Sequence, residues 1–260
     1  MTFGTTSSGT FYFFNKKEQS IPIVFIHGVG LTHEIWQPQL DFFKEYSTLS
    51  YDILGHGKTR LEKKEISFDD FSDQLIKLID ELKIEKIHLV GFSIGSLIAR
   101  NFAIKFSDRL KSLILLCSIY KRSHEQQKIV NQRFDQAKKE LKLSKLALKR
   151  WFTDEYLEKN PNIYEKITSI LSANNMQNFL KVYELFVTHK NDEDFNKIKA
   201  KTLIMTGEHD AGSTTAMSEE LNKIIKNSQL KIINNGKHLC GIECADNVNL
   251  TIKNFIDKNE

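Results

Sequence analysis

Short apolar segments alternate with longer amphipathic segments along most of this chain, and that alternation is the feature that most restricts its fold. Six short segments are predicted strands, and most of them are apolar nearly throughout: 22–28, 47–57, 85–91, 111–118, 200–207 and 229–234. A strand that is apolar on both faces is typical of a parallel sheet covered on each side. We therefore expect an α/β fold with a mainly parallel central sheet and helices on both faces. Residues Thr10–Phe14 are predicted to add an antiparallel strand at one edge.

The strand pattern stops between residues 123 and 194, where only helical patterns occur, including a long one from His124 to Phe152. An all-helical insertion between two strand–helix units is best placed over the carboxyl edge of the sheet, where open α/β folds bind ligands. We expect residues 1–119 and 196–260 to form the core and residues 120–195 to form a helical cap. The alternative is a packing extension without a role at the site.

Composition and charge restrict the partners of this chain. The net charge of +4 is mild and no nucleic-acid-binding motif accompanies it, so we expect no nucleic-acid partner. The uncharged runs are too short to cross a bilayer, and the N-terminus has no secretion signal, so we expect no membrane partner. The sequence indicates no oligomeric state.

The cysteines argue for a reducing compartment and against a metal site. Cys117, Cys240 and Cys244 are too sparse, and odd in number, for a disulfide framework, which fits the cytoplasm. Cys240 and Cys244 lie near His238, but three candidate ligands in one short loop lack the spacing of a zinc site. We therefore expect no metal, and we expect the cysteines near His238 to be small apolar fillers.

Ser93 lies between two glycines, at the point where a predicted buried strand ends and a helix begins. The motif is Gly91-Phe92-Ser93-Ile94-Gly95. A strand-to-helix turn this tight strains the backbone of its central residue, and only small residues fit two positions on either side. The turn projects the hydroxyl above the sheet edge, beside the unpaired N–H groups at the start of the helix. Ser93 is therefore the predicted nucleophile.

A serine nucleophile needs a base, and the base needs an acid that orients it. Asp210 directly follows a later predicted strand and His238 follows the last one, so serine, aspartate and histidine occur in the order that this architecture requires. Glu208 and His209 are rivals, but adjacent residues on one loop cannot easily point into the same triad. We predict Asp210 as the acid and His238 as the base.

Two backbone N–H groups are predicted to stabilise a developing oxyanion. The N–H of Ile94 directly follows the nucleophile. The pair His27-Gly28 ends an early strand and turns the chain beneath the site, which makes the N–H of Val29 the second donor. His27 itself is predicted to be a structural hydrogen-bonding residue of that turn.

With HGVG, YDILGHG, GFSIG, GEHD and GKH in this order, the chain resembles the α/β-hydrolase superfamily over nearly its whole length. The segments FIHGVGLTHEIWQPQL, YDILGHGKT, RWFT and GEHDAGST are similar to 3-oxoadipate enol-lactonases and related carboxylesterases. The resemblance implies a hydrolase that cleaves a small ester or lactone without metal or organic cofactor. It places the nucleophile, acid and base of the family on Ser93, Asp210 and His238. Phe92 and Ile94 depart from the Ser-Met or Ser-Leu pair that enol-lactonases often carry.

Two other functions stay open at this point. A carbon–carbon bond hydrolase that acts on vinylogous diketones uses the same triad. A non-catalytic ligand-binding member of the fold would use only the pocket, although such members usually lack a triad residue and this chain has all three.

Positive charge is concentrated in the first half of the predicted cap. Residues 121–150 hold ten Lys and Arg against three Asp and Glu, whereas residues 151–200 hold six lysines against eight acids. We expect this charge to concentrate anions at the pocket mouth, with Arg150 and Trp151 as substrate-binding residues, because an arginine fork can hold a carboxylate. The substrate is then an ester or lactone that carries a carboxylate. The alternative is a solvated helix face with no such role.

Overall fold

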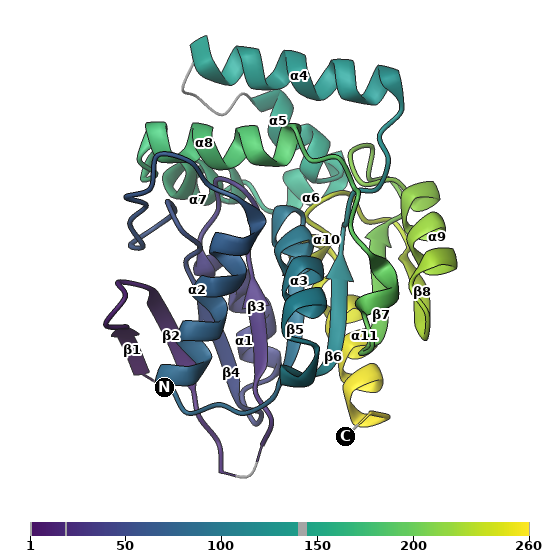
Figure 1. Cartoon of the computed structure of the whole chain (residues 1–260). Helices are drawn as coiled ribbons and strands as arrows, with labels where there is room; N and C mark the ends of the chain where they lie inside the picture. Colours follow the sequence, from purple (N-terminus) through teal and green to yellow (C-terminus); the bar gives the residue numbers. More distant parts are fainter. Residues whose placement is uncertain (1, 19, 140–144, 260) are drawn as a thin grey trace.

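The computed structural model describes residues 2–18, 20–139 and 145–259 of the 260-residue chain. Its centre is one eight-stranded sheet with the strand order β1-β2-β4-β3-β5-β6-β7-β8 (Figure 1). The strands are β1 (Thr2–Thr5), β2 (Phe11–Asn15), β3 (Ile23–Ile26), β4 (Thr48–Tyr51), β5 (Ile87–Phe92), β6 (Leu110–Leu116), β7 (Lys201–Gly207) and β8 (Ser228–Ile233). Strands β3 to β8 run parallel, which confirms the predicted mainly parallel sheet.

Two details differ from the sequence-based expectation. The predicted edge strand is present as β2, but β1 pairs with it in antiparallel fashion and forms the edge itself. β1 is short and mostly exposed, so no apolar run marks it in the sequence. The strand expected over residues 47–57 ends at Tyr51. Beyond it the chain turns through Gly55 and Gly57, both with positive φ, before α2 begins.

The apolar strands separate two hydrophobic clusters, one on each face of the sheet. On β3, Val24 and Ile26 face one cluster, while Ile23 and Phe25 face the other. The first cluster is covered by α2 (Phe68–Glu81), α3 (Ile94–Lys105) and α9 (Thr215–Ile224). The second is covered by α1 (Gln37–Phe42), α10 (Cys240–Glu243) and α11 (Ala245–Asp257). Burial on both faces explains why these strands are apolar without alternation.

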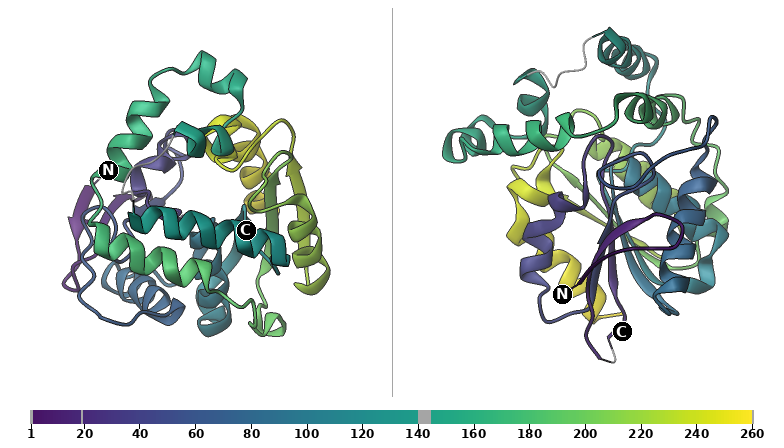
Figure 2. Two further views of the ribbon diagram at one scale, coloured as in Figure 1. Left: turned by 90° about the horizontal axis from the view of Figure 1, so that it is seen from above. Right: turned by 90° about the vertical axis from the view of Figure 1, so that its left-hand side faces the viewer.

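A helical insert lies between β6 and β7, as the interrupted strand pattern predicted. It comprises α4 (His124–Lys139), α5 (Lys145–Trp151), α6 (Asp154–Lys159), α7 (Ile163–Ser172) and α8 (Met176–Val187). Figures 1 and 2 show these helices above the end of the sheet at which the parallel strands finish. The long helical pattern from His124 to Phe152 corresponds to α4 and α5, and residues 140–144 between them lie outside the described residues.

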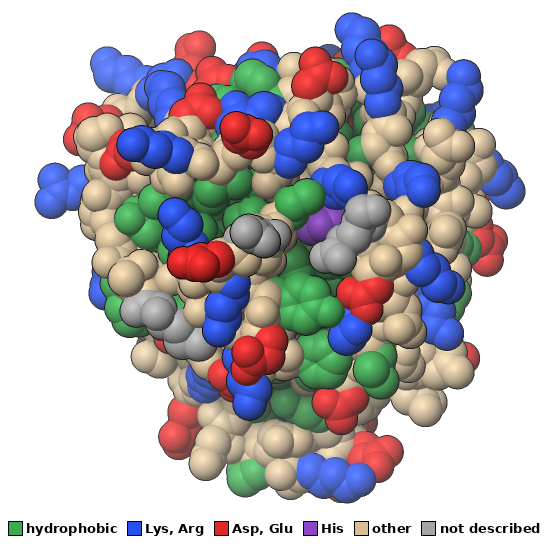
Figure 3. Space-filling view, turned by 90° about the horizontal axis from the view of Figure 1, so that it is seen from below, with side chains coloured by type: hydrophobic (Ala, Val, Ile, Leu, Met, Phe, Trp, Pro, Cys, Tyr) green, Lys and Arg blue, Asp and Glu red, His purple; other side chains and the backbone are tan. Residues whose placement is uncertain are grey.

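The surface at the end of the molecule opposite the insert carries both positive and negative side chains (Figure 3). Seen from below in Figure 3, Lys and Arg side chains are interspersed with Asp and Glu side chains around scattered hydrophobic ones. Within the described ranges of the chain, no helix combines the length and apolar character needed to span a bilayer.

Candidate active site

Ser93 occupies the sharp turn that its flanking glycines predicted. It follows β5 directly and precedes α3, with φ of 55° and ψ of −119°. A serine rarely adopts a positive φ, so the packing around it must hold this strained conformation. A Cβ on Gly91 would overlap the carbonyl of Gly95, and a Cβ on Gly95 would overlap the carbonyl of Ile26. Both positions therefore require glycine, because the helix approaches the strands at backbone distance.

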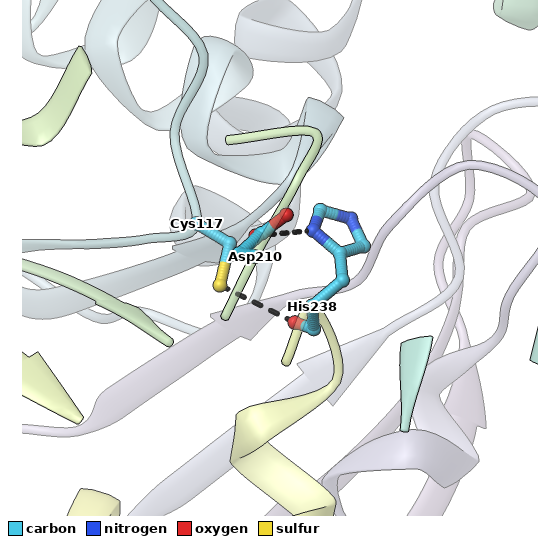
Figure 4. Close-up of side chains that lie close together, drawn as sticks. All are labelled: Cys117, Asp210 and His238. Carbon is cyan, nitrogen blue, oxygen red and sulfur yellow. Dashed lines mark hydrogen bonds and ion pairs between the residues drawn. The ribbon is translucent and has the colours of Figure 1, made fainter. Parts of the chain in front are cut away.

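The structure brings Ser93, Asp210 and His238 together from three separate loops. The Nε2 atom of His238 lies 3.2 Å from the Oγ atom of Ser93. Its Nδ1 atom lies 2.7 Å from Oδ2 of Asp210, a contact that Figure 4 shows. The other carboxylate oxygen of Asp210 accepts hydrogen bonds from the N–H groups of Gly212, at 2.8 Å, and Ser213, at 3.0 Å. Both oxygens are thus occupied, and the carboxylate holds the imidazole in one orientation.

Burial and charge act in opposite directions on this pair. Burial alone would raise the pKa of Asp210, but the charge and hydrogen bond of His238 and the two backbone N–H groups lower it below its ordinary value. Burial alone would lower the pKa of His238, but the Asp210 carboxylate raises it above its ordinary value of 6.5. The side chain of Asp210 is 1% exposed and that of His238 is 17% exposed, so solvent screens their attraction only weakly.

One predicted oxyanion donor, Ile94, begins a helix, and the other, Val29, lies in the turn after β3. Ile94 is the first residue of α3, where helix N–H groups have no partner inside the helix. Val29 follows Gly28, whose Cα is so close that an added Cβ would lie 3.4 Å from the Cβ of Ser93. His27 accepts a hydrogen bond from the N–H of Ile53 at 3.1 Å, and burial lowers its pKa to about 4. It is a neutral structural residue of this turn.

The sequence pattern did not identify three side chains that hold these loops. His56 accepts a hydrogen bond from the N–H of Gly30 at 2.7 Å, and Asn174 of the insert donates to the carbonyl of Gly30 at 2.7 Å. Glu243 accepts from the N–H of Thr153 in the insert, at 2.7 Å, and from the N–H of Lys237, next to His238, at 2.9 Å. Only His56 has a local signal, because it stands in the motif GHG.

Cys117 lies behind the base and is the residue that most resembles a metal ligand. A ligand atom from each of Cys117, Asp210 and His238 lies within 4.8 Å of the other two. The thiol, however, donates to the carbonyl oxygen of His238 at 3.3 Å and points away from the imidazole (Figure 4). Burial raises the pKa of the Cys117 thiol well above its ordinary value. The arrangement therefore favours a structural thiol. Cys240, also buried, packs beside it with its Sγ at 3.7 Å.

The structure places Arg150 and Trp151 at the end of α5 in the insert. The carbonyl of Trp151 accepts a hydrogen bond at 3.0 Å from the N–H of Leu239, the residue after His238. The partly buried side chain of Trp151 packs against the hydrophobic cluster around α1 and α11. Arg150 is half-buried, and burial followed by the charge of Arg133 lowers its pKa. Thus α5 adjoins the loop of His238 through Trp151, and Arg150 lies among other cations.

Comparison with known proteins gives consistent results. The family model described as alpha/beta hydrolase fold matches residues 21–243. The (E)-2-((N-methylformamido)methylene)succinate hydrolase of Acinetobacter baylyi is 28% identical, over 98% of this chain and 97% of its own length. The 3-oxoadipate enol-lactonase 1 of that bacterium is 27% identical, over 88% of this chain and 86% of its own. The crystal structure of the enol-lactonase from Burkholderia xenovorans LB400 superposes with a TM-score of 0.89 at 22% identity, covering 98% of this chain and 100% of that one.

Proposed function

The chain belongs to the alpha/beta hydrolase fold family, as its motifs predicted, and from this premise we propose that it is a serine hydrolase. Its substrate is a small carboxylic ester or lactone, cleaved through an acyl-enzyme. The observation that carries the proposal is the unbroken hydrogen-bond path from Ser93 through His238 to Asp210. A nucleophile, a base and an orienting acid in this contact are the parts that acyl transfer requires.

Each group has a defined role in the proposed reaction. The Ser93 hydroxyl attacks the carbonyl carbon while Nε2 of His238 takes its proton. The negative charge that develops on the carbonyl oxygen faces the N–H groups of Val29 and Ile94. The imidazolium, stabilised by Asp210, then gives the proton to the leaving alkoxide, and the ester C–O bond breaks. A water molecule, deprotonated by His238, attacks the acyl-enzyme, and the proton returns to Ser93 as the acid leaves.

Charge in the insert favours a substrate with a free carboxylate. Arg122, Arg133 and Arg150 all act electrostatically on the phenol of Tyr183, whose pKa is raised by burial against their opposing effect. Among the residues that the structure describes, no aspartate or glutamate lies within ion-pair distance of these arginines. Arg122 donates to the carbonyls of Phe186 and Val187 at the end of α8, at 3.3 Å. Arg133 and Arg150 are therefore the arginines suited to bind a carboxylate, which an arginine holds with two parallel hydrogen bonds.

Aromatic contacts connect this group of arginines to the oxyanion turn. The ring of Tyr183 lies 5.6 Å from that of Phe179, which lies 6.5 Å from that of His56. Phe179 also lies against Gly30, at the end of the turn that contains Val29. The relatives named above fit a carboxylate, because their names contain a succinate and a 3-oxoadipate. We propose that residues 120–195 act as a cap that supplies this selectivity.

A substrate panel tests the proposal. Turnover of p-nitrophenyl esters and small lactones is measured beside a vinylogous diketone, and each acid-bearing substrate is paired with its methyl-capped counterpart. We expect esters or lactones to be hydrolysed, and the charged member of each pair to have the higher kcat/KM at low salt, with the preference shrinking as salt rises. Turnover of the diketone alone would favour the carbon–carbon hydrolase. Binding without any turnover would favour a non-catalytic member of the fold.

A further inference from the structure

Arg100 is a fully buried cation on the helix that begins after the candidate nucleophile. It lies seven residues after Ser93 on α3, which is about two helical turns, and its side chain is 0% exposed. A buried guanidinium is strongly destabilising unless its charge is paired and its N–H groups donate to acceptors. The partners of Arg100 therefore show what this charge holds in place.

One nitrogen of Arg100 holds the first connection, residues 117–123, through which the chain passes from β6 to the insert. Nη1 donates to the carbonyl of Ile119 at 2.8 Å and to the hydroxyl of Ser118 at 3.3 Å. Both partners are buried. The position at which the chain leaves the sheet is therefore set by α3.

The other terminal nitrogen of Arg100 holds the second connection, residues 188–194, through which the chain returns from α8. Nη2 forms an ion pair with Glu193 and lies 3.4 Å from Oδ1 of Asn191. The guanidinium lies over the ring of Phe195, at 4.9 Å, and that ring meets Tyr120 of the first connection edge-on at 5.7 Å. One side chain thus joins both connections between the insert and the core.

Glu193 remains ionised in this position. Burial alone would raise its pKa, but the neighbouring His189 ring and the charge of Arg100 lower the pKa to about 2. Nε2 of His189 lies 3.2 Å from the carboxylate, and its ring meets Phe68, the first residue of α2, edge-on at 4.9 Å. The ion pair is therefore charged at neutral pH and is braced by a second helix of the core.

We propose that Arg100 and Glu193 are positioning residues that clamp the two connections together, so that the placement of the insert above Ser93 depends on this ion pair. The far side of the insert is attached differently, through Asn174 to Gly30 and through Thr153 to Glu243. When those polar contacts separate, together with the hydrogen bond from the N–H of Leu239 to the carbonyl of Trp151, the insert pivots about the clamped connections. The clamp is thus the hinge, and it stays closed during such a motion. Only the kinetic part of this inference depends on the proposed function.

The test compares Glu193→Gln with Asp80→Asn. Asp80 pairs with Arg109, which also donates to the carbonyls of Ile84 and Glu85. The Asp80–Arg109 pair therefore resembles the Glu193–Arg100 pair but lies away from the insert. We expect Glu193→Gln to accelerate amide hydrogen exchange in α7 and α8 by about tenfold or more, since local opening sets exchange in such segments. Exchange in β5 and β6 should stay unchanged. Asp80→Asn should leave exchange in the insert at the wild-type rate.

Kinetics with p-nitrophenyl acetate provide a second readout. A displaced insert should raise KM while kcat changes little, because Ser93, His238 and Asp210 do not belong to the insert. If the wild-type protein hydrolyses no ester, the proposed function fails, whereas the exchange measurement still decides on the clamp.

Glu193→Gln leaves Arg100 buried without its charged partner, and this single variant could fail to fold for that reason. A double variant then keeps the inference testable. Arg100→Met with Glu193→Leu replaces the ion pair by apolar side chains, an exchange that proteins often tolerate without loss of stability. It should fold and still show faster exchange confined to the insert. Wild-type exchange in the insert, or acceleration spread evenly over the sheet and the insert, would overturn the clamp.

Discussion

The carboxyl edge of the sheet, where the parallel strands end, meets the helical insert above Ser93. Different contacts hold this sheet edge and the insert in place. The sheet edge is fixed by the backbone: the N–H of Ser93 donates to the carbonyl of Leu116 at 3.0 Å, and Gly95 packs directly on the carbonyl of Ile26. The insert is attached by side chains, including Asn174 and Glu243, and by the backbone hydrogen bond from Leu239 to the carbonyl of Trp151. A backbone lattice can hold reacting groups to the accuracy that chemistry needs, whereas side-chain contacts can separate and re-form. Substitutions at the edge should therefore reduce kcat, and substitutions in the insert should alter KM.

The largest effect is expected at the edge, from Ser93→Ala. Removing the nucleophile should lower kcat by about a millionfold, because His238 and Asp210 then have no hydroxyl to activate. Far-ultraviolet circular dichroism and substrate binding should match the wild type, since alanine relieves none of the packing at the turn. A purified variant that retains more than about a hundredth of the wild-type rate would exclude Ser93 as the nucleophile.

The acid and the base should show the next largest losses. Asp210→Asn should lower kcat by roughly ten-thousandfold, because the amide favours the wrong tautomer of His238. His238→Ala should be comparably severe. The double variant should lose little more than either single variant, because the residues act as one unit. Losses that multiply in the double variant would show that the two side chains act independently.

The pH dependence of activity should be set by His238 and Asp210 and not by the insert. His238 accepts a proton only when neutral, and the Asp210 carboxylate raises its pKa. Activity should therefore fall as the pH decreases through that raised pKa, with the acidic limb of kcat/KM above pH 6.5. In Asp210→Asn the imidazole, followed by nuclear magnetic resonance, should titrate lower by about one pH unit or more. An unchanged imidazole pKa would contradict control by Asp210.

Local patterns were enough to predict the sheet edge. Ser93, Asp210 and His238 each follow the end of a parallel strand, namely β5, β7 and β8, and parallel strands end at one edge, so the sequence order alone brought the three side chains together. β1 was missed because its residues are mostly exposed and carry no apolar run. The length of β4 was overestimated because Ile53 and Leu54 after it are apolar, whereas the chain turns there through Gly55 and Gly57.

The contacts of the insert could not be predicted in this way. Its helical periodicity was visible, but the apolar faces of α4 and α8 pack on each other, through Phe134 and Tyr183 at 5.3 Å. Periodicity therefore indicates which face is buried and not which residues reach the site. Glu243 and Arg100 act on segments about 90 positions away along the chain, so no short motif marks them. The division into core and cap domains stays a prediction.

A smaller effect is expected from Arg150→Ala in the insert. Loss of one arginine from the group around Tyr183 should raise KM for a carboxylate-bearing ester by about tenfold, the scale of one hydrogen bond to a charged group. KM for its methyl-capped counterpart and kcat for both should change little. Lys149→Ala removes an exposed cation next to it and serves as the control. An equal rise in KM for charged and neutral esters would show that Arg150 does not recognise the carboxylate.

The smallest effect, close to none, is expected from removing metal ions and from changing the Cys244 thiol. Every step of the proposed reaction is carried by Ser93, His238, Asp210 and backbone N–H groups, and the Cys117 thiol stays protonated against the carbonyl of His238. Prolonged treatment with EDTA and a thiol reductant should therefore leave kcat/KM for p-nitrophenyl acetate unchanged. Cys244→Ala should behave like the wild type, because its half-buried side chain packs against the second hydrophobic cluster and reaches the carbonyl of Asn234 at 3.8 Å, and it takes no part in the proposed chemistry. Activity that EDTA abolishes and zinc restores would instead place a metal ion at the carboxyl edge of the sheet. The edge would then not perform the chemistry by itself, and its contrast with an insert that selects the substrate would no longer hold.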